Sequence, residues 1–454
     1  MAAATSSSEL RALLRLGLPV AATQLGVMLT GVVDTMMVGQ LGTEALDAAA
    51  LGSLWAWGTA VFGIGLVLGM DPVVTQAHGA KQGRRVALAL HHGLIVAALV
   101  TPLISAAWWW AAPSLAVLGQ NEALATAAGE YVEIQLFSLW PLLGFFAVRQ
   151  YLQGRGIVAP ALVAVVVANL FNVVANWALI FGHLGLPAMG LRGAGLATGL
   201  TRCVMLATLV GWTYFAKLHR GAWVRPSRAS VEAAGITEIV KHGTPIGIQY
   251  GLETWAFHIA TLMAGMLGEA ELAAHVIVLN LASLSFMIPM GISQGAATRV
   301  GNLVGAGRTE DAKRSATIAL ALGAGVMVLS AVLFVALREQ LPTLYTPEAE
   351  VIGLAAGILP IAAAFQLFDG TQVVGGGVLR GIGATRPAAV FNLVAYYVLA
   401  LPVALAASTL GDFGLEGLWW GLCFGLATVA CALVWWIRRK ASFEPTSTST
   451  DADH

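Results

Sequence analysis

Three carboxylates lie inside long apolar stretches of this 454-residue chain. Asp34 stands in TGVVDTMMVG, Glu253 in QYGLETWAFH and Asp369 in FQLFDGTQVVGGG. A charged side chain at the centre of a bilayer costs about 2.5–3.5 kcal/mol even on permissive scales. Because desolvation disfavours the ionised form, each acid is expected to hold a proton or a cation at neutral pH. The three residues are therefore candidates for ion chemistry, with helix packing through hydrogen bonds as the alternative role.

The partner that the sequence suggests for these acids is a mobile cation. The chain has 24 Lys and Arg residues, but none lies near the middle of the stretches that hold Glu253 and Asp369. Asn172 and Asn176 are four residues apart in NLFNVVANW and share one helical face. Amide oxygens at this spacing suit a small hard cation such as Na+ beside a carboxylate. Asn pairs also join neighbouring helices by hydrogen bonds, and the sequence alone favours that simpler role.

The composition indicates that these residues lie in a membrane. The chain is 58% hydrophobic and 11% charged, with a mean hydropathy of +0.79, far outside the range of a soluble domain. We expect an all-α integral membrane protein with twelve transmembrane helices, because twelve apolar runs can cross a hydrocarbon core of about 30 Å. These runs cover roughly residues 12–38, 48–70, 86–111, 128–151, 158–182, 190–216, 242–267, 272–298, 314–337, 350–378, 387–409 and 414–437.

The distribution of basic residues predicts the orientation, since cytoplasmic loops keep Lys and Arg. With the N-terminus inside, every Lys and Arg except Arg192, Arg202 and Arg338 falls on the inner side. Arg202 is the one basic residue within a predicted span. The N-terminal segment has no cleavable signal pattern, so we expect the first helix to be retained. The predicted location is the cell inner membrane, with both termini in the cytoplasm.

The second half of the sequence repeats the first. At a shift of 226 positions Gly39 meets Gly265 and Gly69 meets Gly295, among other matches. Because each half has an even number of crossings, we expect two six-helix bundles related by a pseudo-two-fold axis along the membrane normal. The predicted parts are an N-lobe at 1–216, a cytoplasmic linker at 217–241, a C-lobe at 242–440 and a disordered tail at 441–454.

Several of these segments together resemble one transporter family. They are VDTMMVGQLG from Val33, TLMAGMLG from Thr261, GNLVGAG from Gly301, and FDGTQVVGGGVLRGIG from Phe368, combined with Glu253. The combination resembles the multidrug and toxic compound extrusion (MATE) transporters, specifically their NorM-like branch, over about residues 10–438. The resemblance implies two bundles that form a V-shaped cavity. It also implies cation-driven export of amphipathic, usually cationic, drugs and dyes.

The resemblance also assigns roles to the polar residues. Asp34 with Asn172 and Asn176 is similar to the cation and proton site of the family's N-lobe. Glu253 with Asp369 is similar to the C-lobe cation site, which makes this pair the Na+ candidate. An aromatic hydroxyl sometimes joins that cluster one turn before the aspartate, but here the residue is Phe365. Its absence leaves H+ and Na+ as equal candidates for the coupling ion.

The expected function is rocker-switch antiport, not enzymatic catalysis. We expect small amphipathic cationic substrates and membrane lipids as partners, no nucleic acid, no cofactor beyond the coupling ion, and a monomer. One alternative is a lipid-linked precursor flippase, which would need basic residues in its cavity to meet a pyrophosphate. The other is an intramembrane enzyme, which would need clustered catalytic groups at one depth. The sequence offers neither set of residues.

Overall fold

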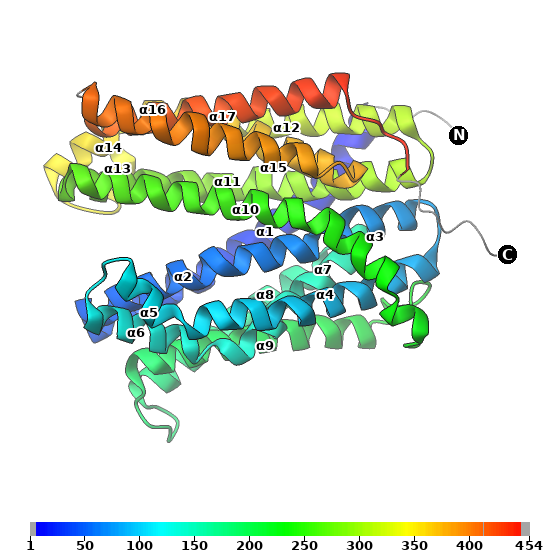
Figure 1. Ribbon diagram of the computed structural model, residues 1–454, viewed down its shortest axis with the longest axis horizontal. Helices are drawn as coiled ribbons and strands as arrows, with labels where there is room; N and C mark the ends of the chain where they lie inside the picture. Colours follow the sequence, from blue (N-terminus) through cyan, green and yellow to red (C-terminus); the bar gives the residue numbers. More distant parts are fainter. Residues whose placement is uncertain (1–5, 412, 446–454) are drawn as a thin grey trace. The chain divides into compact units, whose positions relative to one another are not determined.

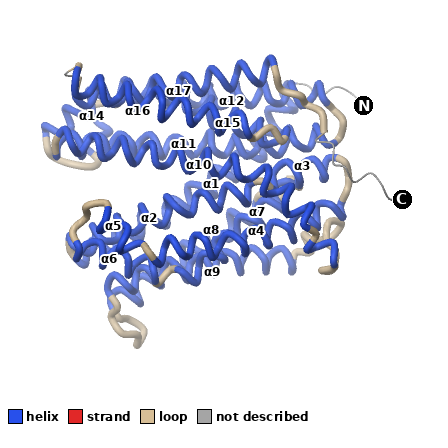
Figure 2. The backbone as a smooth tube through the Cα atoms, in the orientation of Figure 1, coloured by secondary structure: helices blue, strands red, loops and turns tan. Residues whose placement is uncertain are grey.

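The computed structural model describes residues 6–411 and 413–445, and helices are the regular structure throughout this part of the chain (Figures 1 and 2). The α-helices are α1 Ser6–Val38, α2 Thr43–Leu68, α3 Met70–Gly79, α4 Gly83–Trp109, α5 Ala111–Val117, α6 Glu122–Glu133, α7 Leu139–Gly154, α8 Ala159–Phe181, α9 Gly190–Phe215, α10 Ala233–Leu267, α11 Glu269–Gly305, α12 Thr309–Ala336, α13 Gln340–Thr343, α14 Ala349–Ile382, α15 Arg386–Asn392, α16 Leu401–Leu405 and α17 Gly414–Arg439. Short 3-10 turns lie at Gly39–Leu41, Leu136–Ser138 and Arg228–Val231, and π-helical segments at Leu393–Ala400 and Ala406–Leu410.

The helices coincide with the twelve expected spans. In the described residues, ten helical stretches are long and apolar enough to cross a membrane, and the bent pair 122–133 and 136–154 forms an eleventh with a 41° bend. The remaining span lies in α10, which is long enough at 35 residues. Gln249, Glu253 and His258 make α10 less apolar than the others. The helix that carries a candidate coupling residue is thus the one with the weakest hydropathy signal.

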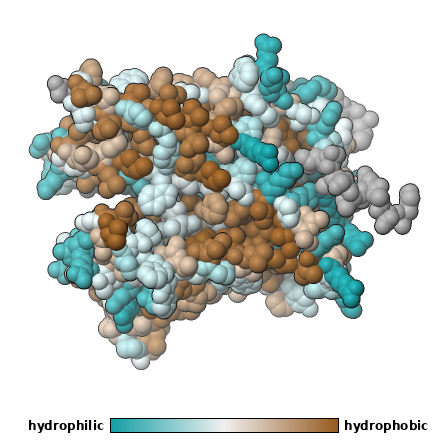
Figure 3. All heavy atoms as spheres, viewed as in Figure 1, coloured by the Kyte–Doolittle hydropathy of each residue, from teal (hydrophilic) through white to brown (hydrophobic). Residues whose placement is uncertain are grey.

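The surface of the helices is suited to lipid. On the face shown in Figure 3, hydrophobic side chains cover much of the length of the helices and hydrophilic ones gather toward the helix ends. Leucines well inside the spans are largely exposed, including Leu99, Leu103, Leu170 and Leu329. In water such a surface would be a binding or aggregation site, whereas in a bilayer it is solvated by lipid tails.

The described chain divides into two compact units. Among the described residues, the C-terminal unit comprises residues 6–22, 75–81, 248–411 and 413–445, and the N-terminal unit comprises Thr23–Val74 and Gln82–Gly247. Within the C-terminal unit, α14 packs against α11, α12 and α17; within the N-terminal unit, α8 packs on α9 and α4 on α7. The predicted linker, 217–241, falls within the N-terminal unit. Most of the tail predicted to be disordered, residues 446–454, lies outside the described residues.

Side-chain bonds explain why the linker groups with the N-terminal unit. The Tyr151 hydroxyl donates to the Ala222 carbonyl oxygen at 2.7 Å, and His92 Nε2 lies 2.9 Å from the Ala229 carbonyl oxygen. Farther along, Arg85 forms an ion pair with Glu238 on α10 at 2.8 Å. These bonds fasten the linker to the ends of α4 and α7.

An ion pair similarly attaches the beginning of α1 to the C-terminal unit. The Glu9 side chain is 1% exposed and accepts a hydrogen bond from Arg299 Nε on α11 at 2.9 Å. A second bond from the same guanidinium makes the contact bidentate. Because a buried carboxylate needs such a partner, this pair fixes the first turns of α1 beside α11.

Candidate ion-coupling sites

The first predicted site forms within the N-terminal unit, where α1, α8 and α9 bring their polar residues together. Asn172 and Asn176 donate through Nδ2 to Asp34 Oδ1 at 3.0 and 2.6 Å. Thr198 on α9 donates to the other carboxylate oxygen, Oδ2, at 2.7 Å. Asp34 is 8% exposed and both amides are fully buried. The structure thus brings together the three residues predicted here and adds Thr198, which sequence reasoning missed.

The two amides are themselves linked to further polar groups. Asn176 Nδ2 lies 3.2 Å from Asn172 Oδ1, and Asn172 Nδ2 lies 3.3 Å from Thr201 Oγ1. In this arrangement NH2 groups face the carboxylate and compensate its charge. Rotating the Asn176 amide about its terminal torsion would turn Oδ1, buried and without a hydrogen-bond partner in the described structure, toward the acid. The cluster can therefore stabilise a free carboxylate and can also offer oxygen to a cation.

A positively charged side chain lies near this site without forming an ion pair with Asp34. Arg202 on α9 interacts electrostatically with Asp34, but no ion pair joins the two in the described structure. Its Nη1 donates to Ser138 Oγ at 3.1 Å, and its guanidinium lies 5.5 Å from the Trp108 ring centroid. The positive charge of Arg202 therefore stabilises the ionised form of Asp34, while the carboxylate remains free to bind other partners.

The second predicted site forms within the C-terminal unit, between α10 and α14. Glu253 and Asp369 interact electrostatically, and Asp369 is 6% exposed. Gln372 Nε2 donates to Glu253 Oε2 at 3.3 Å and lies 3.5 Å from Asn392 Oδ1. Neither acid forms an ion pair with Lys or Arg among the described residues, although Arg380 interacts electrostatically with Glu253. The two acids share one site, as predicted, and amides on α14 and α15 adjoin it.

Phe365 packs beside this second site without contributing a polar atom. Its ring is 2% exposed and lies 6.1 Å from the Phe257 ring and 5.7 Å from the Trp419 ring, centroid to centroid. Among the described residues, no three His, Cys, Asp or Glu side chains come together at one place. A cation at Glu253 and Asp369 would therefore need neutral oxygens to complete its shell.

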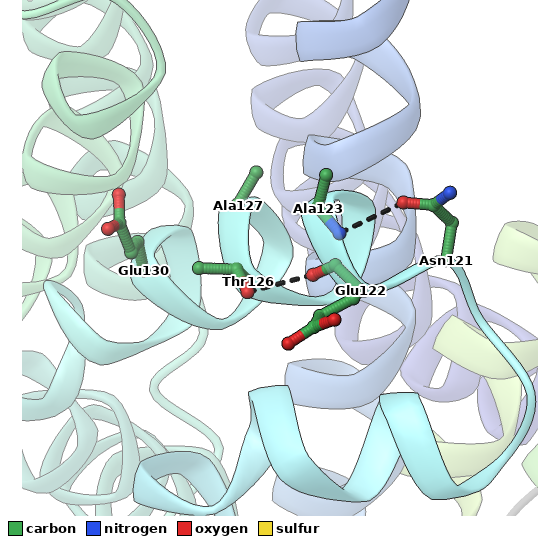
Figure 4. Close-up of a pocket in the computed structure, with 6 residues that line it drawn as sticks. All are labelled: Asn121, Glu122, Ala123, Thr126, Ala127 and Glu130. Atoms are coloured by element: carbon green, nitrogen blue, oxygen red, sulfur yellow. Dashed lines mark hydrogen bonds between the residues drawn. The ribbon is translucent and has the colours of Figure 1, made fainter.

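A separate depression on α6 has no connection to either acid site. It encloses about 660 Å³, and Figure 4 shows the side chains around it. Asn121 accepts from the Ala123 backbone N–H at 2.9 Å, which is an ordinary helix cap, and Thr126 donates to the Glu122 carbonyl oxygen at 2.8 Å. Glu130 pairs with Arg192 at 3.1 Å. These polar groups are satisfied by local structure, so the depression needs no ligand to explain it.

Comparison with known proteins identifies the family. The family model described as MatE matches residues 19–178 and 245–406, more than half of the chain and one segment in each half. The chain belongs to the MatE family. It is similar to the probable multidrug resistance proteins NorM of Mesorhizobium japonicum, 32% identical over 96% of this chain and 95% of the relative, and of Pseudomonas aeruginosa, 33% identical over 98% and 92%.

Solved MATE structures share the fold of this chain. The eukaryotic MATE transporter AtDTX14 superposes with a TM-score of 0.90 over 97% of both chains at 24% identity. An outward-facing MATE family transporter of the MOP superfamily gives 0.86 over 96% of this chain and 98% of its own, at 20% identity. The predicted resemblance and the all-α, twelve-helix membrane fold are thereby confirmed.

Membership in the MATE family also decides between the function classes considered above. The chain is a multi-pass membrane transporter of the NorM-like branch, and MATE proteins are not enzymes and need no cofactor. Drug efflux is favoured over the flippase alternative, because the curated relatives are multidrug resistance proteins. Their names imply small-molecule substrates.

Proposed function

We propose that this MATE transporter exports amphipathic cationic drugs and dyes from the cytoplasm in exchange for entry of Na+ or H+. It would act as a monomer in the cell inner membrane, surrounded by lipid and with both termini in the cytoplasm. The names of the NorM relatives support the drug-export part of the proposal. The ion-coupling part is supported by the chemistry of the two acid sites.

The observation that carries the coupling proposal is the Glu253 and Asp369 pair. The two acids interact within one unit, and no Lys or Arg ion pair neutralises either of them in the described structure. Two carboxylates that share a low-dielectric site cannot both remain ionised without a positive partner. A proton or Na+ that enters the site therefore gains a large interaction, and its departure restores the negative charge. This alternation is the property that an antiporter needs.

The Asp34 site would serve the same cycle differently. The hydrogen bonds from Asn172, Asn176 and Thr198 stabilise the ionised form of Asp34, so this carboxylate can remain charged until a proton or cation binds. In the proposed rocker-switch, the two lobes change their relative tilt and expose the binding region to one side at a time. Ion binding in the outward-open state weakens the attraction of these acids for a cationic drug, which then leaves.

The test is drug export by cells that express charge-removing variants at matched levels. Glu253→Gln and Asp369→Asn each remove one negative charge while keeping the shape of the side chain. Each should abolish ion-driven export, measured as dye accumulation, while membrane insertion stays normal. Glu122→Gln, at an exposed acid on α6, is the matched control and should export like the wild type. Unchanged efflux in both site variants would reject the coupling role of this pair.

A further inference from the structure

The span that follows α14 departs from α-helical geometry beside the second acid site. After α15 the backbone is π-helical over Leu393–Ala400, returns to an α-helix in α16, and is π-helical again over Ala406–Leu410. Segments with i to i+5 bonding are rare and occur frequently at functional sites. They change which side chains face a neighbouring helix. Residues of the first segment that contact α10 could therefore reach the acid site.

Two adjacent tyrosines of this segment reach α10. The Tyr397 hydroxyl donates to the Leu252 carbonyl oxygen at 3.1 Å, one residue before Glu253. The Tyr396 ring is fully buried and lies 6.1 Å from the Phe257 ring, centroid to centroid. The Tyr397 bond therefore fixes the segment at the level of Glu253, and Tyr396 lies inside the unit at that level.

The Tyr396 hydroxyl is a buried polar group that the described protein atoms do not satisfy. It has no hydrogen-bond partner among the described residues, yet it interacts electrostatically with both Glu253 and Asp369. Two more buried atoms lack a partner there, Oε1 of Gln372, whose amide NH2 bonds Glu253, and Nδ2 of Asn392. Since buried polar atoms are almost always bonded, this group of unpartnered atoms beside two acids points to a missing ligand.

The oxygen atoms of these residues have the chemistry of a sodium ligand set. The Glu253 and Asp369 carboxylates, the Tyr396 phenol and the Gln372 amide all offer oxygen, the donor that hard cations prefer. A proton needs one acceptor and would leave the amide and phenol oxygens unused. Na+ binds several oxygens at once and would use all four groups.

We infer that Tyr396 is a ligand of the coupling ion, that it supplies from the π-helical segment the phenolic oxygen that Phe365 lacks, and that this ion is Na+. The inference rests on the coupling role proposed for Glu253 and Asp369. Phe365 and Tyr396 both pack against the Phe257 ring, each at 6.1 Å, so a hydroxyl placed at either position enters the same cluster.

Sodium-dependent thermal stability of the purified full-length protein tests this inference. A ligand that binds only the folded state raises the melting temperature, so Na+ should stabilise the wild type at constant pH and ionic strength relative to choline. Tyr396→Phe should weaken Na+ affinity roughly ten- to hundredfold. Without Na+ its stability should equal or exceed that of the wild type, because the variant removes an unsatisfied hydroxyl. Tyr345→Phe, at an exposed phenol of the same unit, should bind Na+ normally.

A second variant distinguishes ligation from general disturbance of the fold. Phe365→Tyr in the Tyr396→Phe background should restore Na+ affinity. If Tyr396→Phe binds Na+ like the wild type while Glu253→Gln does not, Tyr396 is not a ligand and the coupling proposal stands. If Glu253→Gln also binds Na+ normally, the proposed coupling site itself is wrong. If the wild type shows no Na+-dependent stabilisation, the ion assignment is overturned.

Discussion

Thr198 offers a quantitative test of the Asp34 site, because it bonds one carboxylate oxygen while both amides bond the other. Thr198→Val keeps the shape of the side chain and removes the 2.7 Å donation to Oδ2. A hydrogen bond to a charged group contributes about 1.5–3 kcal/mol, against about 0.5–1.5 kcal/mol for a neutral pair. If Asp34 is ionised, the substitution should therefore lower the free energy of unfolding by about 1.5–3 kcal/mol.

The same substitution in an Asp34→Asn background completes a double-mutant cycle. There Thr198 meets only a neutral amide, so Thr198→Val should cost about 0.5–1.5 kcal/mol and the two changes should couple by about 1–2 kcal/mol. Denaturant titration in mixed micelles at neutral pH measures all four proteins. Thr213→Val is the control on the same helix, since Thr213 donates only to the Leu209 backbone among the described residues. Strict additivity of the two changes would refute a charged Asp34 held by Thr198.

Two further substitutions probe the charges around the sites. Arg202→Gln removes the positive charge that interacts with Asp34. Because that charge opposes binding of a cation at Asp34, the variant should reach half-maximal transport at a lower coupling-ion concentration. An unchanged or higher concentration in proteoliposome assays would contradict this role. Glu9→Gln breaks the buried pair with Arg299, which should lower the free energy of unfolding by about 1–3 kcal/mol because it leaves a partly buried guanidinium without its carboxylate. Arg308→Gln near the same end of α11 has a more exposed partner in Asp311 and should cost less than about 1 kcal/mol in the same denaturant titration.

Much of the fold and the acid sites follows from hydropathy and spacing. Lipid requires continuous apolar helices, so all twelve spans could be predicted from apolar runs; in the described residues eleven of them are long and apolar enough to cross, one bent between α6 and α7, and α10 is the twelfth. Asn172 and Asn176 could be paired from sequence because an interval of four residues places them on one helical face. Asp34, Glu253 and Asp369 could be singled out because isolated acids within such runs are rare.

The remaining site residues depend on tertiary geometry that local patterns do not encode. In the sequence, Thr198 cannot be told from a threonine that bonds only its own helix, as Thr198 itself does through the Ala194 carbonyl oxygen. Gln372 lies three residues after Asp369, a spacing that could have suggested a shared face. Tyr396 interacts electrostatically with both acids from a π-helical segment, whose register a 3.6-residue period does not predict. Phe365 could therefore be recognised as a missing hydroxyl, but its replacement could not be located.

The most direct test of ion-coupled export uses proteoliposomes loaded with a cationic dye under a single imposed ion gradient. An inward Na+ gradient at equal pH should drive dye efflux by the wild-type protein. Liposomes with Glu253→Gln or Asp369→Asn should lose dye no faster than dye-loaded liposomes without protein. Efflux that persists in both variants, or that proceeds equally without any gradient, would contradict the account that these two acids couple ion entry to drug export.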